Sequence, residues 1–328
     1  MTPGGGDAGA AVERLARATR ALITGHQRPD GDSLGSQLAL AELAGALGVA
    51  TVVVNHDPAP STLADLPGAA LVAVGASLPA DFPDRFDLVV AVECPELERA
   101  GFDGLDRLPI LNIDHHPANP LYGEVNYVDV DAPATGEMVW RMFRAAAIEP
   151  SAAAATNTFV ALSTDTGDFR YGNATARAFR AAAEMVDAGA SPTAVAQWIH
   201  GRRRAAAVHL LGAALSTLRL EADGRIAVIE LDHESFRRAG ASPEDTEDIV
   251  NHPRAIDGVR AVVFLKQWER GVVRVSLRST GAVDVRRVAE RLGGGGHANA
   301  AGCTVQGDLA STRELVVTAV REAVEAAS

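Results

Sequence analysis

Four segments of the chain place acidic or histidine side chains directly after a predicted strand or helix. They are residues 26–32 (HQRPDGD), Glu93, residues 114–116 (DHH) and Asp165. Carboxylates and imidazoles are the side chains that hold divalent cations and that move protons near neutral pH. Each segment alone also has a structural explanation, because such residues often cap helices or make hydrogen bonds in turns. Their combination in one chain is what indicates a site.

The elements that must position these residues are short strands alternating with helices. Apolar runs predict strands at residues 21–24, 51–55, 71–74, 88–92 and 110–113, with helical or loop segments between them. This alternation predicts a parallel sheet with helices on both faces. In open α/β sheets, ligands bind at the carboxyl ends of the strands. We therefore expect the four segments to converge at that edge.

Convergence of so many acids has an electrostatic consequence. The side chains expected to meet are those of Asp30, Asp32, Glu93, Asp114, Asp165, His26, His115 and His116. Carboxylates packed this closely repel by several kcal/mol or take up protons, unless cations lie among them. Oxygen ligands with a minority of imidazoles suit manganese or magnesium better than a thiolate zinc site. The surplus of acids suggests two ions, roughly 3.5–4 Å apart, that share a nucleophilic water.

The length of 328 residues favours two domains. Helical segments at 133–147, 151–163, 175–188 and 192–200 close the first domain. A new set of strands begins at residue 226, and the last helix ends near residue 327. We expect an N-terminal parallel-sheet domain over residues 1–201, a helical linker over 202–222 and a smaller α/β domain over 223–328.

The second domain contains two segments that could bind an anion. Residues 293–296 are four consecutive glycines, whose backbone amides can approach a phosphate closely, and His297 follows them. Residues 276–279 (SLRS) end a predicted strand, and Arg278 offers a guanidinium suited to phosphate. Alone, each has a simpler interpretation as a flexible connection or a surface cation.

Composition excludes several classes of protein. The net charge is −12, from 42 acidic and 30 basic residues, whereas a protein that binds long duplexes usually carries a basic field. Two cysteines cannot make a disulfide framework or a four-thiolate zinc site. No apolar run approaches the ~18–20 residues that span a bilayer, and residues 1–9 lack the features of a signal peptide. We expect a soluble cytoplasmic protein that binds neither membranes nor long duplex nucleic acid.

The motifs together resemble a known superfamily. HQRPDGDSLGS, DHH, DTGDF, SLRS and GGGH occur here in the order typical of the DHH phosphoesterases that carry a DHH-associated C-terminal domain. Within them the chain is similar to the small two-domain NrnA type, which combines oligoribonuclease and 3′-phosphoadenosine 5′-phosphate (pAp) phosphatase activities. The resemblance runs from about residue 12 to the last helix.

The resemblance implies a role for each candidate residue. One manganese ion would be held by His26, Asp30 and Glu93, and the other by Asp32, Glu93, His115 and Asp165. His116 would contact the scissile phosphate, and Asp114 would orient the histidines. The nucleotide would be bound by Arg278, Ser279, Gly294, Gly295, Gly296 and His297. Magnesium or cobalt could replace manganese, and a homodimer is expected. The substrates implied are short oligoribonucleotides and pAp, with pApA and c-di-AMP left open.

Glu93 departs from the family pattern, which usually has aspartate at this position. Glutamate keeps the charge but moves the carboxylate outward by one methylene. We expect a functional site with adjusted geometry. Two alternatives stay open: a nucleotide-binding regulatory protein whose catalysis is impaired by Glu93, and a pyrophosphatase of the same superfamily.

Overall fold

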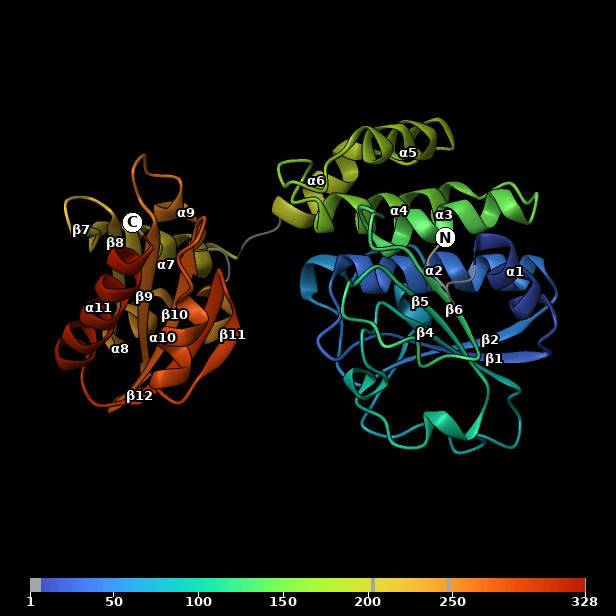
Figure 1. Ribbon diagram of the computed structural model, residues 1–328, viewed down its shortest axis with the longest axis horizontal. Coiled ribbons are helices and arrows are strands. Elements are labelled where there is room, and N and C mark those ends of the chain that lie inside the picture. Colours follow the sequence, from blue (N-terminus) through green and yellow to red (C-terminus); the bar gives the residue numbers. More distant parts are fainter. Residues whose placement is uncertain (1–6, 202–203, 247–248, 328) are drawn as a thin grey trace. The chain divides into compact units, whose positions relative to one another are not determined.

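The computed structural model describes residues 7–201, 204–246 and 249–327, and it divides into two compact units (Figure 1). Unit 1 is Met1–Arg202 and unit 2 is Arg203–Ser328. Each unit has its own sheet, which confirms the expected α/β fold with a parallel sheet in the N-terminal part and a second sheet in the C-terminal part. Residues 202–203, where the linker was expected to begin, lie outside the described residues.

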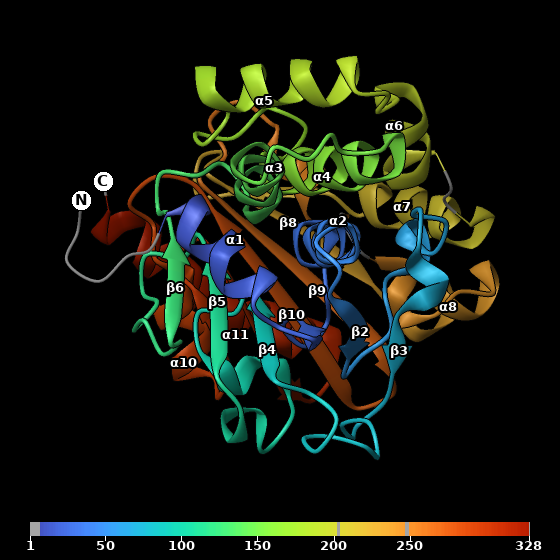
Figure 2. The same ribbon diagram turned by 90° about the vertical axis from the view of Figure 1, so that its right-hand side faces the viewer.

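Unit 1 is built on a parallel sheet with the strand order β3-β2-β1-β4-β5-β6 (Figure 2). The strands are β1 Arg20–Thr24, β2 Ala50–Asn55, β3 Ala73–Val74, β4 Leu88–Val92, β5 Ile110–Asp114 and β6 Val125–Val128. The chain runs outward from β1 to β3 and then crosses back to place β4 on the other side of β1. This reversal of strand order is where open α/β sheets bind ligands.

The two faces of this sheet are covered differently. The α-helices of unit 1 are α1 Ala8–Ala16, α2 Gly31–Ala46, α3 Thr135–Ala145, α4 Ala152–Asp165, α5 Ala176–Asp187 and α6 Pro192–His200. Helices α1, α2 and α3 bury apolar side chains against one face, including Leu15, Leu40 and Phe143. The other face packs on Phe102, Leu105 and neighbouring residues around two short 3-10 helices, η3 Leu97–Ala100 and η4 Leu105–Arg107. The further short 3-10 helices are η1 Ser61–Leu63 and η2 Ala69–Leu71. Figures 1 and 2 show α5 beyond α3 and α4, away from the sheet, and α6 beside the end of α4.

Helix α2 is buried on nearly all sides because it lies between the sheet and α4. The two helices approach so closely that a Cβ atom at Gly35 would lie 2.3 Å from the carbonyl oxygen of Asn157. At the start of α2, a Cβ at Gly31 would lie 2.5 Å from the side chain of Thr164, next to the end of α4. Close packing therefore brings Asp32, in the first turn of α2, toward Asp165, the last residue of α4.

Unit 2 contains a mixed sheet with the order β11-β12-β10-β9-β8-β7, in which only the β8–β9 pair is parallel among the described strands. The strands are β7 Arg219–Glu221, β8 Ile226–Leu231, β9 Ala261–Glu269, β10 Val272–Ser279, β11 Gly295–His297 and β12 Ala300–Gln306. The helices are α7 Ala205–Ser216, α8 His233–Ala239, α9 Asn251–Arg254, α10 Val285–Arg291 and α11 Leu309–Ala326, with the 3-10 helix η5 Pro243–Thr246.

Helix α7 and strand β7 fall within residues 202–222, which the sequence assigns to a linker. In the structure, α7 buries Leu210 and Ala214 in a core with Ile229 and Phe236. Strand β7 pairs with β8 at the edge of the sheet. This segment therefore contributes to the core and the sheet of unit 2.

Among the residues that the structure describes, no helix is long and apolar enough to cross a membrane.

The close approach of α2 and α4 predicts opposite effects for two substitutions in one helix. Gly35→Ala should lower the free energy of unfolding by about 1–3 kcal/mol, because the added methyl group meets a backbone carbonyl. Gly45, near the end of α2, has open space around it, so Gly45→Ala should raise that energy by about 0.4–1 kcal/mol. Urea denaturation measures both changes. Changes of the same sign would contradict this packing.

Candidate metal centre

The predicted ligands lie at the carboxyl edge of the unit 1 sheet. His26 follows β1, Glu93 follows β4 and His115 follows β5, and these three strands are adjacent in the sheet. Their ligand atoms form groups in which all atoms lie within 4.8 Å of one another. The groups are His26–Asp30–Glu93, Asp32–His115–Asp165 and Glu93–His115–His116. The third group shares Glu93 with the first and His115 with the second.

His26 lies between two carboxylates. Its Nδ1 lies 2.7 Å from the carbonyl oxygen of Gln27 and donates to it, which turns Nε2 toward the acids. Nε2 lies 3.1 Å from Oε2 of Glu93 and 3.9 Å from Oδ1 of Asp30. Asp30 is the N-cap of α2, and its Oδ1 accepts from the backbone N–H of Ser33 at 2.9 Å. The start of the helix thus fixes the position of this carboxylate.

Glu93 is buried and adopts a left-handed backbone conformation, with φ +58°. Its backbone N–H donates to the carbonyl oxygen of Ile113 at 2.9 Å, so the turn out of β4 is tied to β5. Left-handed backbone is uncommon outside glycine, and asparagine and aspartate tolerate it better than longer side chains. Residues held this way cluster at functional sites, because the surrounding structure must enforce them.

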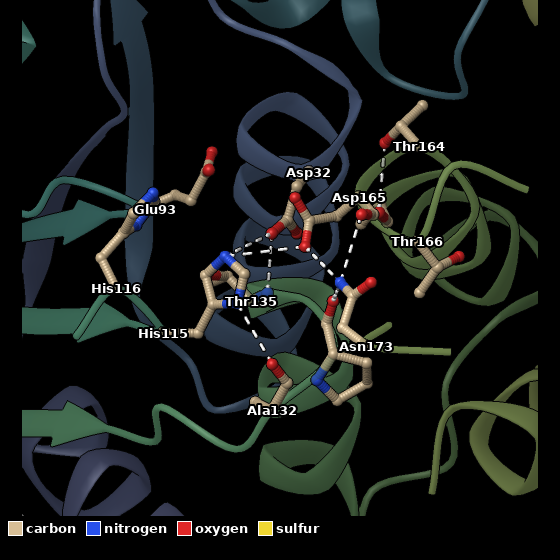
Figure 3. Close-up of polar contacts among 12 residues, drawn as sticks. Asp32, Glu93, His115, His116, Ala132, Thr135, Thr164, Asp165, Thr166 and Asn173 are labelled. Atoms are coloured by element: carbon tan, nitrogen blue, oxygen red, sulfur yellow. Dashed lines mark hydrogen bonds and ion pairs between the residues drawn. The ribbon is translucent and has the colours of Figure 1, made fainter. Parts of the chain in front are cut away.

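The second group centres on His115 (Figure 3). Its Nδ1 lies 3.2 Å from the carbonyl oxygen of Ala132, which accepts its hydrogen. Its Nε2 lies 3.7 Å from Oδ2 of Asp32 and 3.9 Å from Oδ2 of Asp165. Figure 3 shows both carboxylates pointing toward the imidazole. Asn173 donates from its amide to Oδ2 of Asp165 at 3.1 Å and holds this carboxylate in place.

Asp32 is fully buried and connects two helices. Its Oδ2 accepts from the backbone N–H of Thr135 at 2.8 Å, and its Oδ1 accepts from that of Gly136 at 2.9 Å. Both amides belong to the first turn of α3, which follows an alanine that offers no capping oxygen. Asp32 therefore acts as a cap for α3 from a different helix, and the positive end of the α3 dipole stabilises its charge.

His116 is oriented by Asp114. Its Nδ1 lies 2.8 Å from Oδ1 of the buried Asp114, and Asn119 donates to Oδ2 of the same carboxylate at 2.7 Å. His116 itself is half-buried, with 35% of its side chain exposed. Its Nε2 atom is therefore available to a ligand, while Asp114 is enclosed.

Burial changes the protonation of this cluster. Burial lowers the pKa of His26, but the carboxylates of Asp30 and Glu93 outweigh it and raise the pKa to about 10. Burial, together with the nearby Asp165, raises the pKa of Asp32 to about 7 against the opposing effect of His115. Burial also raises the pKa of Glu93 well above its usual value. Without cations, the cluster therefore holds protons at neutral pH.

The donor set fits divalent cations. Backbone carbonyls accept the Nδ1 hydrogens of His26 and His115, which leaves each Nε2 to act as a ligand. The remaining donors are carboxylate oxygens, which suit magnesium and manganese. A cation would replace the protons that the buried acids otherwise retain.

The structure adds supporting residues that the sequence did not reveal. Asn119 orients Asp114, and Asn173 orients Asp165. The carbonyl oxygen of Ala132 accepts from His115, and the backbone N–H groups of Thr135 and Gly136 donate to Asp32. Neither asparagine stands in a recognisable motif, and backbone groups carry no sequence signal.

The candidate nucleotide-binding residues lie in unit 2, and the structure differs from the expectation in the secondary structure of one segment. The run of glycines is typical of a flexible connection, but Gly295–His297 forms the edge strand β11, paired with β12. Arg278 lies on β10 and donates to the carbonyl oxygen of Leu277 at 3.0 Å. Ser279 is buried, and its hydroxyl donates to the carbonyl oxygen of Val283 at 2.6 Å. The Ser279 hydroxyl thus stabilises the turn after β10 through this hydrogen bond.

Known proteins show the same two-part organisation. The DHH family, N-terminal domain, matches residues 20–164, and the DHHA1 domain matches residues 223–326. The chain is 35% identical over 315 residues to the bifunctional oligoribonuclease and PAP phosphatase NrnA of Thermus thermophilus. This match covers 92% of this chain and 89% of that protein. The chain is a DHH-family phosphoesterase of the NrnA type. The family expected from the motifs is thereby confirmed.

A second NrnA relative and one solved structure are also similar to this chain, the latter in fold. The NrnA protein of Bacillus subtilis is 25% identical over 292 residues, 87% of this chain and 88% of that protein. An exopolyphosphatase-related protein from Bacteroides fragilis has the same fold, with a TM-score of 0.85 and 22% identity over 95% of this chain and 96% of that chain. DHH phosphoesterases are metal-dependent enzymes. In the described part of this chain, the acidic cluster of unit 1 contains groups that could hold a metal.

The pKa values predict how the metal-free protein responds to pH. The pKa of His26 rises from 6.5 to about 10 on folding, so its stabilisation is complete below pH 6.5 and is lost as pH rises toward 10. The pKa of Asp32 rises from 3.8 to about 7, so its contribution is also lost as pH rises, between these values. The urea concentration at the unfolding midpoint of the chelated protein should therefore decrease as the pH is raised from about 6 to about 9.

The control for this prediction is His26→Gln, in which the fall should be smaller. Saturating Mn²⁺ should reverse the trend in the wild type, because cations bind the deprotonated groups. A urea midpoint that rises with pH in the metal-free protein would contradict the proposed protonation of the cluster.

Proposed function

We propose that the protein is a manganese-dependent phosphoesterase that hydrolyses short nucleotides with two metal ions and an activated water. The substrates are short oligoribonucleotides and pAp, and the related pApA and c-di-AMP belong to the same chemical class. The observation that carries this proposal is the pair of three-ligand groups at one sheet edge, linked through Glu93 and His115. The names of the NrnA relatives support the substrate class.

Two cations would be held by different parts of the cluster. His26, Asp30 and Glu93 would hold the first, and Asp32, His115 and Asp165 the second, with Glu93 reaching toward both. When bound, two such ions neutralise phosphate charge and lower the pKa of water so that it becomes a nucleophile. The protein contributes fixed ligand positions in a buried setting, where electrostatic interactions are strong.

His116 and Asp114 would act on the substrate phosphate. The Asp114 carboxylate accepts from Nδ1 of His116 and fixes the orientation of the ring. Nε2 is then the ring atom that would contact a phosphate oxygen. Because Asp114 is fully buried and also receives Asn119, the ring stays oriented as charge develops on the phosphate.

Glu93 supports activity in this arrangement. Although its side chain is longer than the family aspartate, its carboxylate still lies among the ligand atoms of His26, Asp30, His115 and His116. This position supports a role as a ligand, and turnover distinguishes it from the alternative of a regulatory protein with impaired catalysis. Glu93 is therefore proposed as a ligand whose backbone conformation compensates for its length.

The glycines at and just before β11 support nucleotide binding by unit 2. A Cβ at Gly294 would lie 2.1 Å from the carbonyl oxygen of Gly302, and one at Gly296 would lie 2.5 Å from that of Ala300. Packing therefore requires glycine at these two positions. At the exposed Gly295, a Cβ would meet none of the described atoms within 4 Å. The backbone of Gly295 is therefore open to the close approach of a ligand.

The expected location and assembly remain predictions of the sequence. A cytoplasmic homodimer is proposed because the NrnA type is expected to assemble in this way. The net charge of −12 agrees with short substrates, since a long duplex would be repelled outside a local basic surface.

A turnover panel tests the proposed function. The chelated protein should hydrolyse neither pAp nor a short oligoribonucleotide, and Mn²⁺ should restore both activities more fully than Mg²⁺. Hydrolysis of pApA and c-di-AMP should be measured in the same series, to rank the four substrates. Full activity in metal-stripped protein would contradict the two-metal mechanism. Tight nucleotide binding without turnover would favour the regulatory alternative.

The assignment of nucleotide binding to unit 2 predicts a difference between substrates. Gly295→Ala and Arg278→Ala should each lower kcat/KM for pAp by about 10–100-fold, because a phosphate contact to a charged or backbone donor is lost. Hydrolysis of bis-p-nitrophenyl phosphate should stay near the wild-type rate. Gly212→Ala, at an exposed glycine of α7 with open space around it, is the matched control. Equal losses on both substrates would place these residues in catalysis or in the fold.

A further inference from the structure

The end of strand β2 contacts the loop that carries the first group of ligands. After β2 the chain reads Asn55-His56-Asp57, and after β1 it reads Gly25-His26-Gln27-Arg28-Pro29-Asp30. Because β1 and β2 are adjacent and parallel, these two segments leave the sheet side by side. We call residues 25–30 the ligand loop, since it contains His26 and Asp30.

The contacts between the two segments follow the sequence in order. The buried Asn55 accepts through Oδ1 from the backbone N–H of Gly25 at 3.3 Å. The side-chain amide of Gln27 lies 3.4 Å from Nδ1 of His56. The remaining contact is the shortest and involves Asp57, whose Oδ2 accepts from the backbone N–H of Arg28 at 2.9 Å.

The ligand loop is also held from the opposite side, by the segment that follows β4. The backbone N–H of Gln27 donates to the carbonyl oxygen of Arg99 at 2.7 Å. A Cβ atom at Gly101 would lie 2.7 Å from Cγ of Gln27, so the Gln27 side chain packs directly on this glycine. The ligand loop therefore lies between the segments that follow β4 and β2, of which the first begins with Glu93 and the second contains Asp57.

The contact of Asp57 with Arg28 bears on the spacing of the two ligands in the loop. Arg28 lies midway between His26 and Asp30, and it adopts a left-handed conformation with φ +54°. A residue with a Cβ atom disfavours this conformation, so it persists only where other contacts enforce it. The hydrogen bond from its N–H to Asp57 is such a contact. A return of Arg28 to negative φ would change the spacing of His26 and Asp30.

Asp57 is itself held in position. Its other oxygen, Oδ1, lies 2.8 Å from Nδ1 of His56. The His56 ring packs against Phe102, with 5.8 Å between the ring centres. The carboxylate is thus anchored on one side and binds the ligand loop on the other.

We propose that Asp57 is a positioning residue for the cation held by His26, Asp30 and Glu93. It stabilises the left-handed conformation of Arg28 and thereby keeps the two ligands of the loop at the spacing that the cation requires. This inference rests on the proposed function, because it assumes that the loop binds a metal ion. Asp57 acts through the backbone of Arg28 and does not itself coordinate the ion.

The test is a calorimetric titration of the chelated full-length protein with Mn²⁺ alone. Asp57→Ala should weaken one of two binding steps about 10–100-fold, as is typical when a residue that supports a ligand is removed. The other step should stay unchanged, because Asp32, His115 and Asp165 lie outside the ligand loop. The readout is metal affinity, so it does not depend on turnover.

A matched control separates positioning from general stability. Asp87 also accepts a backbone N–H, that of Thr19 at 2.7 Å, but at the amino end of the same strand β1. Asp87→Ala should lower the urea midpoint of the chelated protein and leave both Mn²⁺ affinities unchanged. An equal loss of affinity in Asp87→Ala would show that loosening of β1 is sufficient, and it would overturn the proposal.

A second variant tests the route through Arg28. Glycine adopts positive φ freely, so the effect of Asp57→Ala should be smaller in the background of Arg28→Gly than in the wild type. An equal effect in both backgrounds, or wild-type affinity in Asp57→Ala, would overturn the role of Asp57 while leaving the proposed function intact. A wild-type protein that binds no Mn²⁺ would overturn both.

Discussion

Negative charge at the carboxyl edge of the unit 1 sheet is the constraint on which the rest of the site depends. Asp32, Glu93 and Asp114 are buried at this edge, and Asp32 and Glu93 lie in ligand groups with His115 and His26. Burial favours the neutral form of each acid, and mutual repulsion adds to this effect. The protein can hold the cluster open to a ligand only by supplying protons, backbone N–H groups or cations. The raised pKa values of His26 and Asp32 show protons in this role, and divalent cations would replace them.

Secondary structure supplies the remaining compensation. Asp30 caps its own helix, and Asp32 receives two amides from the first turn of α3, so both carboxylates face helix N-termini. Helices α2, α3 and α4 pack closely, because a Cβ at Gly35 in α2 would meet Asn157 of α4 and a Cβ at Gly136 in α3 would meet Ala161 of α4. The positions of the metal ligands and the spacing of the helices therefore depend on each other. A change in helix spacing would move the ligands, and a change of ligand would leave a helix end without its partner.

The sequence was sufficient for the parts of this account that depend on pattern. Apolar runs located β1, β2, β4 and β5, and the rule that ligands bind at the carboxyl ends of strands brought His26, Glu93 and His115 together. Strand β6 was missed because VNYV is short and half polar, and β11 was missed because glycines predict a loop. Contacts through the backbone, such as that of Ala132 with His115, leave no signature in the sequence. The left-handed conformations of Arg28 and Glu93 were equally hidden, since neither residue type indicates positive φ.

The most direct test of the central claim is the stoichiometry of Mn²⁺ binding and the number of protons released. The chelated wild-type protein would be titrated in two buffers of different ionisation enthalpy near neutral pH, so that proton release is separated from the heat of binding. If cations replace the protons held by the buried acids and His26, two ions should bind per chain, with net release of protons that grows as the pH is lowered toward 6.5. Binding of fewer than two ions, or binding without proton release, would contradict this account.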